Sequence, residues 1–211
     1  MATLKAWFKL KISTPQGQDA FKAAFYYKVP GQLRLDRWGF MNQLTGTVWS
    51  RQDKVVVQIP SKNLYLLGNN DELAAVLWGR DFLLSDLPSL LLGRPPLAPE
   101  GVRLSRQGRY LLAESATRKI LLGFAKATRE LVYQAELDAT GNRLWEVFYH
   151  EPKKIGDLEL MSYLRLQVGA HTKLELSLQK VLLNRELAVD LFEARISPNA
   201  RIESLHEALS W

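Results

Sequence analysis

The sequence LELMSYLRLQVGAHTKLELSL (residues 158–178) alternates apolar and polar side chains in two successive stretches. The first runs from Leu158 to Val168, and Leu174, Leu176 and Leu178 repeat the pattern after a break at residues 169–172. Successive side chains of a β-strand point to opposite faces of a sheet, so a period of two predicts strands. This segment therefore predicts two long strands that follow one another along the chain.

The same period runs outward from this segment through most of the chain. Leu4, Phe8 and Ile12 fall on one face of an N-terminal strand, with lysines on the other face. Polar turn clusters such as 51–53 and 138–142 separate further alternating segments. We expect roughly six strands before residue 68 and about eleven in all, the last of them near residues 187–191.

The period changes between residues 69 and 93. Asn69 and Asn70 can cap a helix, and the acids that follow them suit its first turn. A second helical start at Ser85-Asp86 leads to Gly93, which is placed to end a helix before two prolines. We expect two short apolar helices here, and a short helical tail over residues 200–209.

About eleven strands in one sheet have to curl or close, because twist accumulates and open edges promote aggregation. The sequence thus predicts a mainly β fold with a few α-helices, built as an antiparallel barrel or part-barrel. We expect one domain over residues 1–211, with strands at 4–67, helices at 70–93, strands at 101–192 and a short C-terminal tail. The helices would cover an open end or a concave face.

Composition narrows the possible functions. Among the 211 residues 47% are hydrophobic and 24% are charged, and there is no cysteine, which excludes disulfides, thiolate metal sites and a cysteine nucleophile. The net charge of +6 would suit an anionic partner, although a solvated basic surface explains it as well. No apolar stretch is long enough for a membrane-spanning helix or a signal peptide. The start Met1-Ala2 also suits an expressed fragment, from which an upstream signal or anchor has been removed.

Catalytic and nucleic-acid signatures are weak. The histidines at 150, 171 and 206 do not have metal-ligand spacing, and no nucleophile elbow, phosphate loop or zinc-protease motif is present. Trp7, Tyr26 and Trp49 lie among basic residues, as on a single-strand nucleic-acid platform. Interleaved aromatics are more often ordinary strand residues on a half-buried face, so we expect neither an enzyme nor a nucleic-acid partner.

Alternation by itself does not say what the apolar face meets. A transmembrane barrel shows the same period, but full charges on the polar faces favour a soluble barrel with an apolar interior. That interior is either a packed core or a pocket for an acyl chain, and periodicity does not distinguish the two.

The segment from Pro30 to Pro95 resembles the lipoprotein carrier and receptor superfamily of LolA and LolB, especially the LolB-like lipoproteins. The similarity is carried by four runs, the last of them the most specific: GQLRLD (31–36), RWGF (37–40), YLLG (65–68) and LLLGRP (90–95). The resemblance implies an incomplete, half-open antiparallel barrel whose apolar concave face is covered by a helical lid over acyl chains.

What the resemblance implies about function is specific. Members of the receptor type sit on the periplasmic face of the outer membrane through a lipidated N-terminal cysteine, which this sequence lacks. They help to insert or localise lipoproteins there, a chaperone-like role in protein transport. A loop of that type projects an apolar residue toward the membrane, and Trp38 occupies the similar position here, with Phe40 beside it. Simple packing of Trp38 on the sheet edge is the alternative.

We therefore predict a monomeric binder of lipoprotein acyl chains or phospholipid, without a cofactor or metal, that meets a periplasmic carrier protein and the membrane surface. A generic binder of hydrophobic ligands and a non-catalytic envelope scaffold are the alternatives. The predicted cavity-lining residues, chosen by face and place, are Phe8, Phe25, Leu35, Leu44, Val48, Val57, Leu66, Leu77, Trp78, Leu91, Leu122, Phe124 and Phe148.

Overall fold

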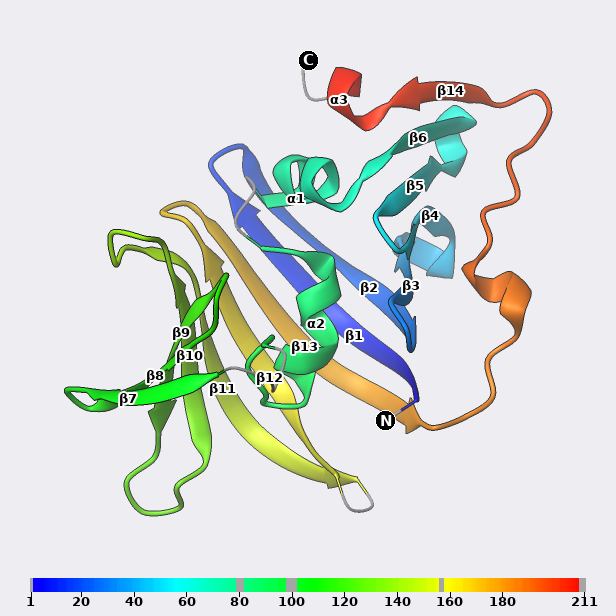
Figure 1. Ribbon diagram of the computed structural model, residues 1–211. Coiled ribbons are helices and arrows are strands. Elements are labelled where there is room, and N and C mark those ends of the chain that lie inside the picture. The colour runs from blue at the N-terminus through cyan, green and yellow to red at the C-terminus, as the bar shows by residue number, and fades with distance from the viewer. Residues whose placement is uncertain (1, 79–81, 98–101, 156–157, 209–211) are drawn as a thin grey trace. The chain divides into compact units, whose positions relative to one another are not determined.

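The structure is a computed structural model that describes residues 2–78, 82–97, 102–155 and 158–208 (Figure 1). The chain divides into two compact units. The first unit comprises Met1–Lys11, Asp19–Ser85 and Leu178–Trp211, and the second comprises Ile12–Gln18 and Asp86–Ser177. The single domain expected from the sequence stays a prediction.

The described residues form fourteen strands in one sheet, in the hydrogen-bonded order β14-β6-β5-β4-β3-β2-β1-β13-β12-β11-β10-β9-β8-β7. Pairing is antiparallel from β2 to β6 and from β8 to β12 along the chain, and β14 runs parallel to β6. The strands are β1 (Thr3–Thr14), β2 (Gly17–Lys28), β3 (Gln32–Trp38), β4 (Leu44–Arg51), β5 (Lys54–Ile59), β6 (Leu64–Asn69), β7 (Arg103–Gln107), β8 (Tyr110–Glu114), β9 (Lys119–Phe124), β10 (Leu131–Leu137), β11 (Arg143–Ile155), β12 (Leu158–Val168), β13 (Thr172–Leu183) and β14 (Arg201–Ser204).

The sheet is open, because β14 and β7 stand at its two ends. The predicted fold class, a mainly β chain with an incomplete antiparallel sheet and a few helices, is confirmed. The six strands expected before residue 68 are also present. The predicted total of about eleven was too low, since short strands such as β7 and β14 carry little apolar alternation.

Short helices interrupt the strands. They are α1 (Asn70–Trp78), α2 (Leu87–Leu91), α3 (Leu205–Ala208) and the 3-10 turns η1 (Phe40–Asn42), η2 (Pro60–Lys62), η3 (Leu84–Asp86) and η4 (Val189–Phe192). Among the described helices none is long and apolar enough to cross a membrane.

The predicted helix signals between β6 and β7 are confirmed. At the start of α1 the side chain of Asn69 accepts a hydrogen bond from the backbone N–H of Glu72 at 2.8 Å, and the Glu72 carboxylate accepts one from the N–H of Asn69 at 3.0 Å. This reciprocal pair is a capping box. Beyond α2, Gly93 has a φ of +60° and donates its N–H to Leu90, which ends the helix as glycine does in the left-handed conformation.

The C-terminal segment departs from the prediction. Residues 187–191 do not form a strand: they lead into η4, and its Phe192 packs in a cluster with Ala24 and Tyr26. The backbone carbonyl of Leu191 accepts hydrogen bonds from the side chains of Arg34 and Trp49. Leu187 and Leu191 pack against this cluster, whereas Val189 is 65% exposed, so the alternation here does not reflect strand pairing.

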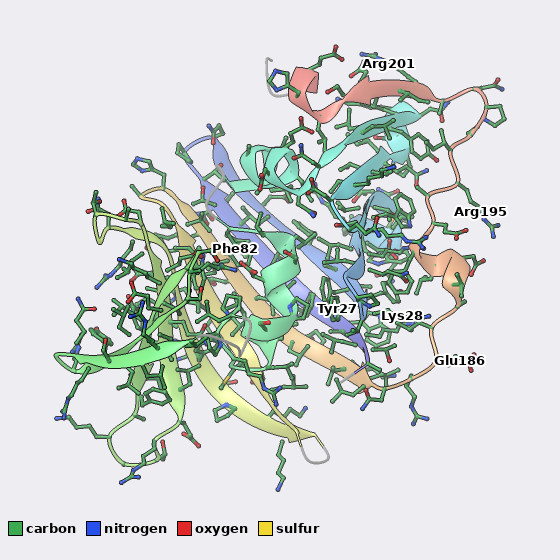
Figure 2. The ribbon with its side chains drawn as sticks, in the orientation of Figure 1. Tyr27, Lys28, Phe82, Glu186, Arg195 and Arg201 are labelled. Atoms are coloured by element: carbon green, nitrogen blue, oxygen red, sulfur yellow. The ribbon has the colours of Figure 1, made fainter. Side chains whose placement is uncertain are left out.

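Figure 2 labels Glu186 and Arg195 on this connecting segment and Arg201 on the strand that follows. The predicted helical tail at 200–209 is only partly correct, because β14 pairs with β6 before α3 begins, and Leu209 lies outside the described residues.

Candidate functional site

Six of the predicted cavity residues form one apolar row across the first unit. Five of them stand directly opposite one another on neighbouring strands: Phe25 on β2, Leu35 on β3, Val48 on β4, Val57 on β5 and Leu66 on β6. The ring of the sixth, Phe8 on β1, lies 6.2 Å from the ring of Phe25. Antiparallel register places directly opposed side chains on the same face of the sheet. The structure thus brings these six residues together, and we call them the apolar row.

The row is not uniformly covered. Phe8, Phe25, Val48 and Leu66 are buried, whereas Leu35 and Val57 are only half-buried. Leu35 and Val57 are therefore the members of the row that solvent, or a ligand in its place, can contact most. The face has the composition that an acyl chain requires, with no charged member in the row.

The other predicted residues of the first unit lie beside the row or outside the description. Leu44 is half-buried where the β3–β4 register shifts, opposite Trp38. Leu77 is half-buried on α1. The side chain of Trp78 lies outside the described residues.

The second unit has a similar line of directly opposed side chains, in which one amide stands among apolar residues. Its members stand directly opposite one another on neighbouring strands: Leu122 on β9, Gln134 on β10, Val147 on β11, Leu166 on β12 and Leu174 on β13. Gln134 is fully buried, and neither Oε1 nor Nε2 has a hydrogen-bond partner among the described residues. A buried amide without partners costs free energy, so a group supplied by a ligand would be favoured here.

Tyr149 adds a third unpartnered polar atom to the two of Gln134. It lies two residues beyond Val147 on β11 and so on the same face as Gln134, and its hydroxyl has no partner among the described residues. Burial raises the pKa of the Tyr149 hydroxyl well above its ordinary value, so this group is a neutral donor. Sequence reasoning missed both residues, because alternation placed the apolar face of β10 on the side of Tyr133, opposite to Gln134, and the choice of Phe148 on β11 took the side opposite to Tyr149.

A buried ion cluster holds α2, which contacts β12 (Figure 1). Arg118 donates two hydrogen bonds to Asp86, at 3.0 and 2.7 Å, and another to Glu136 on β10 at 2.8 Å. It also donates one to the backbone carbonyl of Pro96, and the indole N–H of Trp145 donates to Glu136 at 2.7 Å. Since Asp86 precedes α2 and Pro96 follows it, one guanidinium ties both ends of this helical segment to the strands.

The electrostatics of this cluster follow from burial and pairing. Burial raises the pKa of the Asp86 carboxyl, and the hydrogen bonds and charge of Arg118 act against that rise. Burial by itself lowers the pKa of Arg118, but hydrogen bonds to two carboxylates outweigh it and raise that pKa overall. Arg118 therefore stays charged in this cluster. Leu91, the predicted cavity residue on α2, is buried in the same helix.

Two predicted cavity residues belong elsewhere. Phe148 faces Tyr133, on the sheet face opposite to that of Leu122 and Gln134. Both faces of β11 carry apolar side chains, so alternation could not tell which is buried. Phe124 joins Phe148 because the β9–β10 register shifts between Leu131 and Tyr133 and reverses the expected face.

Phe124 and Phe148 line a pocket of about 550 Å³ in the second unit, which we call the aromatic pocket. Its lining residues come from β8 to β11, the turn before β8 and the turns between these strands: Arg109, Tyr110, Gly123, Phe124, Lys126, Val132, Tyr133, Phe148, Tyr149 and His150. A pocket of this size is in the range of small-molecule sites.

The loop between β3 and β4 carries exposed apolar side chains. Trp38 is the last residue of β3 and is half-buried, whereas Phe40 and the following Met41 are 86% and 84% exposed. The N–H of Gly39 donates to the carbonyl of Gln43 and closes the loop. Of the two predicted membrane-directed residues, Phe40 stands at the tip and Trp38 does not, because strand pairing holds Trp38 opposite Lys22. The sequence analysis missed Met41, although its place beside Phe40 was visible.

A second, more polar pocket of about 340 Å³ lies in the first unit. Arg34, Trp49 and Tyr65 line it from the sheet, and Asp190 and Arg195 belong to the part contributed by the C-terminal segment. Asp190 and Arg195 pair with each other, and Arg34 pairs with Asp36. Within the described residues no group of histidine and acidic side chains could hold a metal ion.

The arrangement of strands is shared with solved structures. A LolA superfamily protein from Nitrosomonas europaea aligns over 92% of this chain and 90% of its own, with a TM-score of 0.62 and 11% identity. The chain has the LolA fold.

Two further structures align almost as fully. A domain described as an outer membrane lipoprotein-sorting protein from Vibrio parahaemolyticus matches 90% of this chain and 89% of its own, with a TM-score of 0.65 and 12% identity. A DUF1329 family protein from Desulfovibrio piger matches 91% and 90%, with a TM-score of 0.67 and 12% identity. No family sequence profile and no curated protein matches the chain. These similarities of structure establish the fold of the chain. At sequence identities of 11–12% they do not show that it shares the function of any of these proteins.

Proposed function

We propose that the protein binds the acyl chains of lipids or lipoproteins along the apolar row and passes them to a membrane. The observation that carries this proposal is the row itself, six apolar side chains on one face of six strands, two of them only half-buried. The LolA fold supports it, because one protein of this fold is described as a lipoprotein-sorting protein.

The dimensions of the row suit an acyl chain. Neighbouring strands lie about 4.8 Å apart, so a row over six strands extends roughly 24 Å. The acyl layer of one membrane leaflet is about 15 Å thick, half the hydrocarbon core. Each methylene buried on the row would contribute about 0.8 kcal/mol. A single chain therefore gains enough from burial to bind without a charged contact.

The second unit offers a ligand's carbonyl group two polar donors of its own. An acyl chain in a lipid or lipoprotein is attached through an ester or amide, and either group offers a carbonyl acceptor. The Nε2 group of Gln134 and the hydroxyl of Tyr149 are donors that no described residue satisfies. Such a carbonyl would remove part of their desolvation cost.

The finer parts of the proposal concern place and partners. We place the protein on the periplasmic face of the outer membrane, as a LolB-like receptor that takes its cargo from a periplasmic carrier and works as a monomer. The exposed pair Phe40 and Met41 supports contact with a membrane, since apolar side chains at a loop tip favour the bilayer interface. An upstream lipid anchor belongs to this proposal.

The experiment compares two neighbouring valines of β5. Val57 belongs to the apolar row, whereas Val56 faces Trp49 and Leu67 on the opposite sheet face, and both are half-buried. Native mass spectrometry and titration with a triacylated lipopeptide would be applied to Val57→Asp and to the matched control Val56→Asp. Leu35→Gln provides a milder change in the same row.

We expect saturable binding by the original protein and by Val56→Asp, and at least about a tenfold loss in Val57→Asp, because an aspartate in the row would have to be desolvated. Circular dichroism confirms that each variant is folded. Equal binding by all variants, or absence of saturable binding by the original protein, would contradict the proposal and leave the envelope scaffold as the better account.

A further inference from the structure

The aromatic pocket is separate from the apolar row, since it belongs to the second unit alone. It also lies on the sheet face opposite to that of Gln134, because Tyr133 and Phe148 alternate with Gln134 and Val147 along β10 and β11. The apolar row thus does not account for the pocket, which shares only Tyr149 with the unpartnered donors of the second unit.

Three rings form its floor and are held in place. The ring of Tyr133 lies 5.3 Å from that of Tyr110 and 5.1 Å from that of Phe148. The Tyr133 hydroxyl donates to Glu146 at 2.9 Å, and Arg109 donates to the Tyr110 hydroxyl at 2.7 Å. Both tyrosine rings are tied at their polar ends, so the floor is apolar and preorganised.

Gly123 allows this floor to form. A Cβ atom at that position would lie 3.0 Å from the Cβ of Tyr133 and 3.2 Å from the ring of Tyr110. A larger residue would push the Tyr110 ring away from the strand. The absence of a side chain at Gly123 thus lets Tyr110 and Tyr133 lie close against β9.

The mouth of the pocket combines exposed apolar surface with positive charge. Phe124 and Phe148 are 42% and 38% exposed. The described lining includes Arg109, Lys126 and His150 and contains no aspartate or glutamate. An apolar floor with a basic edge is complementary to an apolar body with one acidic group.

We propose that the aromatic pocket binds one anionic amphiphile, a molecule with an apolar body and a single carboxylate or phosphate head group. The apolar body packs against Tyr110, Phe124 and Phe148, with the buried Tyr133 ring holding two of these rings in place, and the head group meets Arg109 and Lys126. Single-stranded nucleic acid also uses aromatic and basic residues, but it stacks on exposed ring faces. Tyr133 is only 6% exposed, and the neighbouring rings tilt against it by 38° and 57°, which favours the amphiphile.

The test uses decanoate, decyl phosphate and uncharged decanol, measured by calorimetry and by the NMR amide shift of Gly123. It is performed in the Val57→Asp protein, where binding on the apolar row is disabled, so that failure of one site does not imply failure of the other. We expect one site for the two anions, with a shift at Gly123. The tighter of the two anions identifies the head group.

Matched variants separate the apolar and the charged contributions. Phe148→Ser should weaken binding of both anions about tenfold through lost apolar contact, whereas Leu104→Ser, at an exposed leucine of β7, should leave it unchanged. Reversing Arg109 and Lys126 together to glutamate should also cost about tenfold for the anions but not for decanol. The control Lys173→Glu, at an exposed lysine of β13, should change affinity by less than about twofold.

Three outcomes would overturn the proposal. Decanol could bind as tightly as decanoate, the anions could bind without shifting Gly123, or a single-stranded oligothymidine could bind in the pocket and displace them. The last result would assign the pocket to nucleic acid.

Discussion

Replacing Gln134 by leucine should stabilise the protein, contrary to the usual effect of a substitution in a core. The side chain is fully buried, and both of its polar atoms lack partners among the described residues. The residues directly opposite it are Leu122 and Val147, both apolar. Leaving a buried polar group unpaired costs about 1–3 kcal/mol, and leucine removes that cost while keeping a similar volume. We expect a gain of about 2 kcal/mol in the free energy of unfolding.

Urea unfolding of the ligand-free protein measures this gain. The midpoint should rise with an unchanged m-value, because the surface exposed on unfolding hardly changes. For a chain of this length a gain of 2 kcal/mol raises Tm by about 4–8 °C. The matched control is Gln167→Leu, since that amide is half-buried and donates to the carbonyl of Gly169. It should bring no gain.

The result that would refute this reasoning is a loss of stability on replacing Gln134. It would mean that the amide is satisfied in solution, by a bound water for example. A further consequence follows from the proposed function. An acyl ligand whose carbonyl pairs with Gln134 should bind more weakly to the leucine variant, so saturating ligand should narrow or reverse the stability difference.

Three other perturbations have definite expected outcomes. Arg118→Ala should lower the free energy of unfolding by about 3 kcal/mol, because it leaves two buried carboxylates unpaired; a loss below about 1 kcal/mol in urea unfolding would refute this. Hydrogen bonds within its turn lower the pKa of Asp138 from 3.8 to about 2, so its stabilising contribution is complete above pH 3.8 and is lost as pH falls through about 2. Burial raises the pKa of Asp86, so the pH dependence of its contribution to stability is the reverse of that of Asp138. That contribution is present below pH 3.8 and is lost as pH rises through the raised pKa. NMR titration should show a pKa below 3.8 for Asp138 and one above 3.8 for Asp86. Changing Phe40 and Met41 to serine should alter stability by less than about 0.5 kcal/mol but reduce binding to phospholipid vesicles, and unchanged vesicle binding would remove this loop from the proposal.

Local sequence signals predicted the elements well where a single residue type has one structural use. Asn69 caps α1 and Gly93 ends α2, because few residues satisfy the free N–H groups of a helix start or adopt a positive φ. The turn at 138–142 is likewise fixed locally, since Asp138 accepts hydrogen bonds from Thr140 and Asn142. Such features need no information from distant parts of the chain.

The candidate site was predictable only in part. Alternation was enough to choose five members of the apolar row, because the side of a strand that is apolar throughout usually faces a core. They are Phe25, Leu35, Val48, Val57 and Leu66. That these five stand directly opposite one another depends on register, which the turns and the partner strands set together. The sequence could not show that Arg118 joins residues 32 positions before it and 18 after it.

The sequence by itself determined that this chain is mainly β, where β1 to β6 and the helix signals at Asn69 and Gly93 fall, and which apolar side chains share a face of β1 to β6. Only the tertiary structure decided which of two apolar faces of β11 is buried, where the register shift that moves Phe124 lies, and that Leu187, Leu191 and Phe192 pack on a sheet face without strand pairing. The reason is physical: alternation records the two faces of a strand, whereas burial depends on which neighbours the folded chain brings against each face.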